Sequence, residues 1–120
     1  MAGTDGGEAR GGSVALDRVG GAAVLRVSGA LDLALAPKLQ QLVERAVRLG
    51  PAVLVIDLTD VGFLASAGMA VLLRAQRECP PGTAVRIVAQ SRIVLRPMEL
   101  TRLTDEFDLF PTLATALDGG

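Results

Sequence analysis

The segment AVLVIDLTDVGFLASAGM, residues 52–69, decides the fold. Residues 52–58 are almost continuously apolar and rich in β-branched side chains, which is typical of a strand buried on both faces of a parallel sheet. Composition predicts a turn over residues 59–62 and then a helix over about residues 67–78, which Pro80-Pro81-Gly82 ends. A buried strand followed by a helix is the repeating unit of α/β domains.

On the N-terminal side of this segment, the sequence predicts a β-hairpin and an amphipathic helix. Residues 14–19 and 22–27 are short extended runs joined by Gly20-Gly21, and a tight hairpin turn needs the positive φ that glycine allows. The helix has Pro37 in its first turn and ends at Gly50-Pro51. Its apolar stripe comprises Leu35, Leu39, Leu42, Val43, Ala46 and Leu49.

On the C-terminal side, a further strand is predicted over residues 84–89. Ser91 is a suitable N-cap for a helix through Leu103, which Pro97 should kink. A short strand and a last helix, opened by Pro111-Thr112, complete the pattern. Strands that alternate with helices after an opening hairpin predict an α/β fold with a mixed, mostly parallel sheet in the order ββαβαβαβα.

Length and composition limit the domain organisation. The chain has 120 residues, the size of one domain, and five of its first twelve residues are glycine. We therefore expect a disordered glycine-rich tail over residues 1–13 and a single domain over residues 14–118. No apolar run has the length of a membrane-spanning helix, and the N-terminus lacks the pattern of a secretory signal. We expect a cytoplasmic protein that does not bind membranes.

Composition also excludes several kinds of chemistry. The chain has no His, one cysteine (Cys79) and one lysine (Lys38), which argues against His-based catalysis, disulfides and a P-loop. A net charge of −1 and only three aromatic residues disfavour nucleic-acid binding. Asp32, Asp57 and Asp60 could gather at the strand ends and hold Mg²⁺, but roles in turns and at a strand end explain them better. We expect no enzyme activity, no cofactor and no metal.

Two loops at the carboxyl ends of the predicted strands, residues 28–33 and 58–66, are where such sheets usually place function. Ser66 lies where the second loop enters a helix. It is either a structural N-cap, whose side chain accepts a backbone N–H, or a phosphorylation site at the positive end of the helix dipole. A phosphoryl group would add about −1.5 to −2 charges to a surface of small apolar side chains, and so would switch docking.

The chain resembles the STAS domain family, and within it the stand-alone bacterial anti-sigma factor antagonists. The resemblance spans about residues 14–117 and rests on the order and spacing of several motifs. These motifs are Gly29-Ala30-Leu31-Asp32, Ile56-Asp57-Leu58, Phe63-Leu64-Ala65-Ser66-Ala67-Gly68-Met69, Ser91-Arg92-Ile93-Val94 and Glu99-Leu100-Thr101. The resemblance implies the STAS fold.

The resemblance also implies that the protein is a binding switch. Family members of this type dock, unphosphorylated, onto an anti-sigma factor that has an ATP-binding kinase domain, and so release a sigma factor. The kinase phosphorylates the serine that aligns with Ser66, which breaks the complex, and a phosphatase resets the cycle. Asp32 matches the family's loop aspartate beside that serine. The expected partner-binding residues are Asp32, Leu64, Ala65, Ser66, Ala67, Gly68 and Met69.

Three positions depart from the family pattern. Ala65 and Ala67 stand where the family usually has Asp before the serine and Ser or Thr after it. Arg102 stands where the family often has a helix-ending glycine. Alternatives therefore stay open: a STAS module that is never phosphorylated and acts as a constitutive antagonist or scaffold, a ligand sensor that uses a pocket beside Asp32, or a phospholipid-transport accessory subunit.

Overall fold

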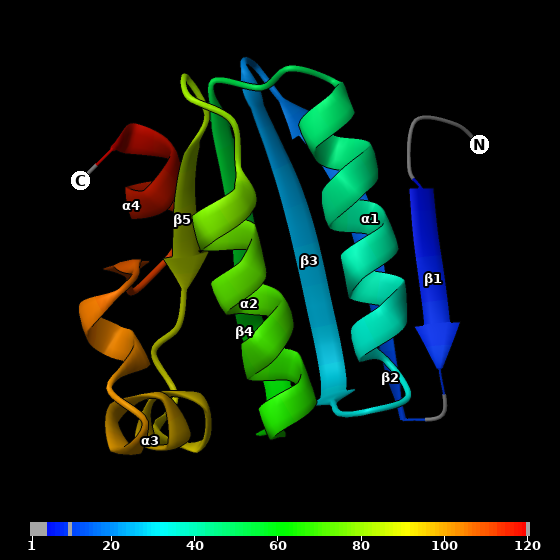
Figure 1. Ribbon diagram of the computed structural model, residues 1–120, viewed down its shortest axis with the longest axis vertical. Helices are drawn as coiled ribbons and strands as arrows, with labels where there is room; N and C mark the ends of the chain where they lie inside the picture. The colour runs from blue at the N-terminus through cyan, green and yellow to red at the C-terminus, as the bar shows by residue number, and fades with distance from the viewer. Residues whose placement is uncertain (1–4, 10, 120) are drawn as a thin grey trace.

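The computed structural model describes residues 5–9 and 11–119, and in this part of the chain six strands form one sheet in the order β1-β2-β3-β4-β5-β6 (Figure 1). β1 and β2 pair antiparallel, as do β2 and β3, whereas all later neighbours pair parallel. This arrangement confirms the predicted mixed, mostly parallel sheet with an opening hairpin, and adds one strand before it. The elements are β1 (Asp5–Ala9), β2 (Gly12–Val19), β3 (Ala22–Leu31), α1 (Ala36–Arg48), β4 (Val53–Leu64), α2 (Ser66–Glu78), β5 (Ala84–Val88), α3 (Arg92–Leu100), the 3-10 helix η1 (Leu103–Asp105), β6 (Asp108–Phe110) and α4 (Leu113–Asp118).

The helices cover both faces of the sheet. α1, α2 and α3 lie on one face, where strand residues such as Leu25, Ile56 and Ile87 are fully buried. α4 packs on the opposite face, where Ala116 contacts the valines that alternate with those core residues. Because both faces of β4 are covered, its first half reads as a continuous apolar run. Within the described residues, no helix is long and apolar enough to cross a membrane.

The hairpin and the amphipathic helix form where the sequence predicts them. β2 and β3 join at Gly20-Gly21, with φ +59° at Gly20. Pro37 lies in the first turn of α1, and Gly50 follows the helix with φ +68°. The predicted stripe faces the sheet and is buried, except that Leu49 just beyond the helix end is 42% exposed.

The prediction of a disordered tail over residues 1–13 is wrong for the part that the structure describes. β1 pairs with β2 from Asp5 opposite Leu16 to Ala9 opposite Gly12, because the open edge of β2 offers backbone hydrogen bonds that need no side chains. Gly12 is required by packing rather than by flexibility, since a Cβ there would lie 2.8 Å from the carbonyl oxygen of Ala30. Residues 1–4 and 10, also in the predicted tail, lie outside the described residues.

The predicted turn over residues 59–62 is also wrong, because β4 continues through it to Leu64. Between the pairs Ala22–Val53 and Leu31–Leu64, β4 contains two more residues than β3, and the pairing shifts register twice. Such bulges leave extra residues of the longer strand unpaired and break the regular alternation of its side chains. Buried residues therefore recur every third position, at 58, 61 and 64, with exposed pairs between them. Residues 28–31, predicted as part of a loop, likewise belong to a strand, β3.

The C-terminal elements follow the predicted order with one changed boundary. The hydroxyl of Ser91 accepts a hydrogen bond from the N–H of Ile93 at 3.1 Å, which confirms Ser91 as the N-cap of α3. α3 ends at Leu100 rather than Leu103, because Arg102 adopts the left-handed conformation, with φ 62°. Thr112 caps α4 as predicted. The kink expected at Pro97 stays a prediction.

Replacement of Arg102 by glycine is expected to stabilise the fold. Arg102 is the one non-glycine residue with positive φ in the described part of the chain, and its Cβ is strained there. We expect Arg102→Gly to raise the free energy of unfolding by about 0.5–1 kcal/mol, measured by urea denaturation. Arg96→Gly is the matched control: Arg96 lies exposed inside α3, where glycine should lower stability by about 1 kcal/mol. Equal effects of the two substitutions would contradict the assignment of strain to residue 102.

Candidate functional site

The candidate site is built where the ends of β3 and β4 meet the beginning of α2. The N–H of Ala65 donates to the carbonyl oxygen of Leu31 at 3.0 Å, which joins the segment after β4 to the last residue of β3. A Cβ placed on Gly68 would lie 2.6 Å from Cγ of Leu31 and 2.8 Å from its carbonyl oxygen. Glycine at position 68 therefore lets the first turn of α2 rest directly on the end of β3.

Ser66 is the first residue of α2 and not its N-cap, so the structural interpretation of Ser66 is wrong by one residue. The N-cap is Ala65, with extended backbone and no side-chain cap. The reason is that β4 runs to Leu64 and leaves one residue between strand and helix. Ser66 is exposed, and its hydroxyl has no hydrogen-bond partner within residues 5–9 and 11–119. The uncapped first turn keeps N–H groups and the positive end of the helix dipole available to an anion.

Asp32 organises the turn that leads from β3 into α1. Its carboxylate oxygen Oδ1 accepts hydrogen bonds from the N–H groups of Ala34, at 3.1 Å, and Leu35, at 3.2 Å. The hydrogen bond between the N–H of Ala65 and the carbonyl oxygen of Leu31 joins the two segments. Asp32 directly follows Leu31, and Ser66 directly follows Ala65, so Asp32 and Ser66 flank this hydrogen bond. Asp32 is half-buried and contributes to the site by holding this turn in place.

The remaining residues of the predicted docking set divide into surface and core. Leu64 is 5% exposed and belongs to the main hydrophobic core, so its side chain supports the site from beneath. Gly68 is also buried against Leu31. Ala65, Ala67 and Met69 are partly exposed and form the surface next to Ser66.

Exposed apolar side chains at the same end of the molecule are functional candidates that the sequence reasoning missed. We call them the apolar rim: Leu33 (78% exposed), Phe63 (56%), Ile93 (55%) and Leu100 (69%). They belong to segments that meet here, because the turn after β3, the end of β4 and helix α3 all border α2 (Figure 1). Large exposed apolar side chains at one end of a molecule are candidates for contacts with a partner. The signal in the sequence was the doublet Gly62-Phe63 between two buried positions of β4.

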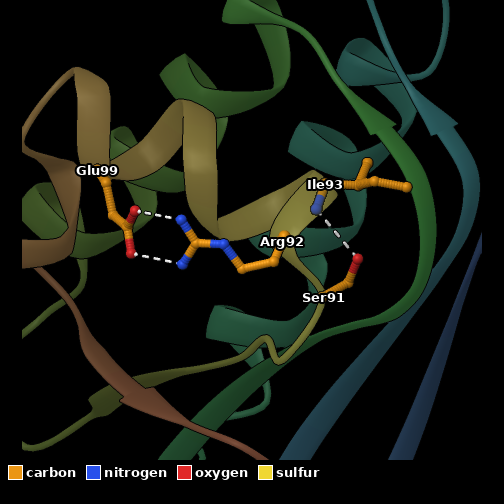
Figure 2. A network of polar contacts seen from close by, with 4 residues as sticks. All are labelled: Ser91, Arg92, Ile93 and Glu99. Atoms are coloured by element: carbon orange, nitrogen blue, oxygen red, sulfur yellow. Dashed lines mark hydrogen bonds and ion pairs between the residues drawn. The ribbon is translucent and has the colours of Figure 1, made fainter.

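Contacts of α3 connect the apolar rim to α2 and neutralise one arginine. The hydroxyl of Thr101 lies 3.8 Å from the sulfur of Met69, which brings the end of α3 beside the first turn of α2. In Figure 2, the Ile93 side chain points away from α3, while Arg92 turns back along the helix to Glu99. Arg92 and Glu99 form a two-pronged ion pair, at 3.0 and 3.1 Å. Arg92 is therefore paired on the surface of α3 and is not an isolated cation next to Ser66.

The other polar candidates have structural environments. The Asp57 carboxylate accepts hydrogen bonds from the backbone N–H and the hydroxyl of Thr59, whereas Asp60 is exposed. In the described ranges, no three acidic or cysteine side chains gather in a way that could hold a metal ion. Burial raises the pKa of the Cys79 thiol, so the thiol is protonated at neutral pH and is a poor nucleophile.

Comparisons with known proteins agree on one family. The profile of the STAS domain matches residues 13–116. The anti-sigma-F factor antagonist RsfB of Mycobacterium tuberculosis is 36% identical over 99 residues, a match that covers 82% of this chain and 81% of that protein. A crystal structure of an anti-sigma factor antagonist from Mycobacterium paratuberculosis superimposes with a TM-score of 0.86 at 35% identity, covering 90% of this chain and 92% of that one. Unphosphorylated SpoIIAA shares the fold, with a TM-score of 0.73 at 19% identity over 88% of this chain and 93% of its own.

Replacement of Gly68 by alanine should separate α2 from β3. The added methyl group would collide with the backbone and side chain of Leu31, and the backbone oxygen cannot move aside alone. We expect Gly68→Ala to lower the free energy of unfolding by about 1–3 kcal/mol in urea denaturation, despite the better helix propensity of alanine. Gly62→Ala is the control, because nothing lies within 4 Å of a Cβ there. A neutral Gly68→Ala would show that the contact does not position α2.

Proposed function

The chain belongs to the STAS domain family, and from that premise we propose that it is an anti-sigma factor antagonist, a regulatory protein that binds an anti-sigma factor and thereby frees a sigma factor. Two relatives at about the same identity, one of them matched over nine-tenths of this chain, are named as antagonists of this kind. The observation that carries the proposal is the exposed Ser66 at an uncapped helix start, next to the apolar rim.

In the proposed complex, the apolar rim and the partly exposed residues beside Ser66 form the docking face. Burial of apolar side chains against a partner supplies the main favourable free energy of such an interface. Phe63 is the strongest single candidate for an anchor, because aromatic residues are enriched among the side chains that dominate binding. The fixed contact between Gly68 and Leu31 keeps this face rigid, so little ordering free energy is lost on docking.

The switch is phosphorylation of Ser66 by the partner, an anti-sigma factor with an ATP-binding kinase domain. The Ser66 hydroxyl oxygen attacks the γ-phosphorus of ATP, the bond to ADP breaks, and the hydroxyl proton passes to a base that the kinase supplies. This protein contributes the exposed hydroxyl of Ser66, which has no hydrogen-bond partner in the described part of the chain, and the step requires no cofactor or metal from it. A phosphatase that hydrolyses the phosphoester returns Ser66 to its docking-competent state.

The added charge weakens docking and is held in place by this chain's own helix. A phosphoryl group brings about −1.5 to −2 charges to the middle of an apolar face, and burying them against a partner carries a large desolvation cost. The helix dipole and the free N–H groups of the first turn favour the charged form. Ala65 strengthens this effect, because the family's usual aspartate at that position would place a competing carboxylate at the same helix end.

Charge at position 66 should control the affinity for the anti-sigma factor. We expect Ser66→Asp to weaken binding at least about tenfold and Ser66→Ala to leave it unchanged, measured by calorimetric titration of the purified anti-sigma factor with ADP present. Thr112→Asp is the matched control: it adds the same charge at the N-cap of α4, on the opposite face of the sheet.

Two other outcomes are informative. If Ser66→Asp and Ser66→Ala bind the anti-sigma factor equally, the protein is a constitutive antagonist and the charge switch fails. If the wild-type protein does not bind an anti-sigma factor at all, the antagonist function itself is wrong.

A further inference from the structure

β1 is the outermost strand of the sheet and leaves one edge open. Within residues 5–9 and 11–119, β1 pairs with β2 on one side, and no strand pairs with it on the other side (Figure 1). Backbone N–H and C=O groups of alternate residues therefore point to this edge without a strand partner. Such a row of groups is a template for pairing with another extended chain.

Two of the usual protections of an edge strand are missing from β1. The strand contains no proline, and its pairing with β2 runs along its whole length without a bulge. Gly6 and Gly7 at its centre have no side chains that could screen the backbone. A second chain can therefore approach this edge closely.

Basic side chains of α1 stand beside the open edge. A groove of about 350 Å³ lies between β1 and α1, and the exposed side chains of Lys38, Arg45 and Arg48 line it. The stem of Lys38 lies against β1, with carbon atoms 3.3–3.8 Å from the position that a Cβ on Gly7 would occupy. Glycine at position 7 thus lets α1 hold a cation directly over the outermost strand.

The groove carries an excess of positive charge. Glu44 is the one acidic side chain among its three basic ones. Neither Lys38 nor Arg48 has an ion-pair or hydrogen-bond partner in the described part of the chain. Side chains alternate along a strand, so Glu8 points to the opposite face of β1 from its neighbour Gly7, which faces α1. An anionic occupant would therefore meet net positive charge on the α1 side.

We propose that the open edge of β1 and the basic groove together bind an extended, acidic segment of a partner protein. The segment joins the sheet as one more strand beside β1, through backbone hydrogen bonds. Every second side chain of this strand faces α1, where Asp or Glu meets Lys38 and Arg48. α1 separates this surface from α2, so the inference goes beyond the proposed function (Figure 1).

Both features of the surface are needed to select this occupant. The open edge requires a polypeptide in an extended conformation, because only such a chain matches its alternating donors and acceptors. The basic side chains require negative charge. A second copy of this chain meets the first requirement only, because it would bring the same basic face of α1 to the shared edge, and like charges repel across an interface. A nucleic acid meets the second requirement only.

Three peptides of seven residues separate charge from strand pairing. The probe is TETETET, acetylated and amidated at its ends, whose glutamates share one face of a strand. TQTQTQT has the same backbone without the charge. TEPEPET keeps the three glutamates but lacks two of the N–H groups that a strand donates. Each peptide is titrated into isotope-labelled protein at low ionic strength, and the NMR shifts of the protein's amides give the affinity and the location of binding.

We expect TETETET to bind about tenfold more tightly than TQTQTQT, the factor expected for two exposed ion pairs. TEPEPET should bind at least about tenfold more weakly than TETETET, because it cannot pair fully with the edge. Shift changes should concentrate on β1 and α1. In the saturated complex, hydrogen exchange should slow at the β1 amides that point to the open edge.

Paired substitutions test the role of the basic groove. Lys38→Gln combined with Arg48→Gln should reduce the preference for TETETET over TQTQTQT to about threefold or less. Arg96→Gln combined with Arg102→Gln is the matched control, because it removes the same charge from exposed positions on and after α3. This control should retain the tenfold preference, since the net charge of the protein is then equal in the two variants.

Four results would overturn the proposal. Equal affinity for TETETET and TQTQTQT, or no binding of either, would show that the groove does not recognise acidic side chains. Equal affinity for TEPEPET would show attraction of negative charge without strand pairing. Loss of the preference in the Arg96 and Arg102 variant would show an effect of net charge alone. A dimer of the protein by itself, with protected β1 amides, would make a second copy the occupant. Because Ser66 and the anti-sigma factor play no part in these experiments, their failure leaves the proposed function standing.

Discussion

The contact of Gly68 with Leu31 is the constraint on which the rest of the site depends. Leu31 ends β3 with its side chain against Gly68 and its carbonyl oxygen bonded to the N–H of Ala65. Leu31 thus fixes where α2 begins relative to the sheet and the direction in which the helix runs. Ser66 is exposed because its neighbours on both sides are held, and Asp32 braces the adjoining turn with two further hydrogen bonds. The proposed docking face is thus anchored to the end of β3 through Leu31.

Periodicity predicted those elements whose burial repeats with an ordinary helical or strand spacing. α1 could be found from its apolar stripe, and the hairpin from Gly20-Gly21, because local chemistry and tertiary packing agree there. The second half of β4 could not be predicted in this way, since two bulges change the repeat of buried residues from two to three, and the exposed pairs between the buried positions resemble a turn. β1 was missed because its pairing uses backbone groups alone, which leave no trace in side-chain pattern.

For the candidate site, the sequence predicted where Ser66 and Asp32 lie in the fold but not their local geometry. Ser66 and Asp32 could be named from the strand–helix boundaries that they occupy. That Ala65 rather than Ser66 is the N-cap depends on where β4 ends, and only the bulged pairing with β3 determines that point. The apolar rim could not be predicted for a related reason: Phe63 and Ile93 come from distant segments, and a sequence pattern does not show which exposed residues lie at the same end of the molecule.

Ala65 and Ala67, which flank Ser66, change the start of α2 in a way that does not simply abolish phosphorylation. They remove side-chain oxygens that would compete for the helix start, and leave one hydroxyl in the loop. The measurement that tests this account most directly is phosphosite mapping by tandem mass spectrometry after incubation with the cognate anti-sigma factor and ATP. The account predicts one phosphoryl group, on Ser66. An unmodified protein, or a phosphoryl group on another hydroxyl such as that of Ser91, would contradict it.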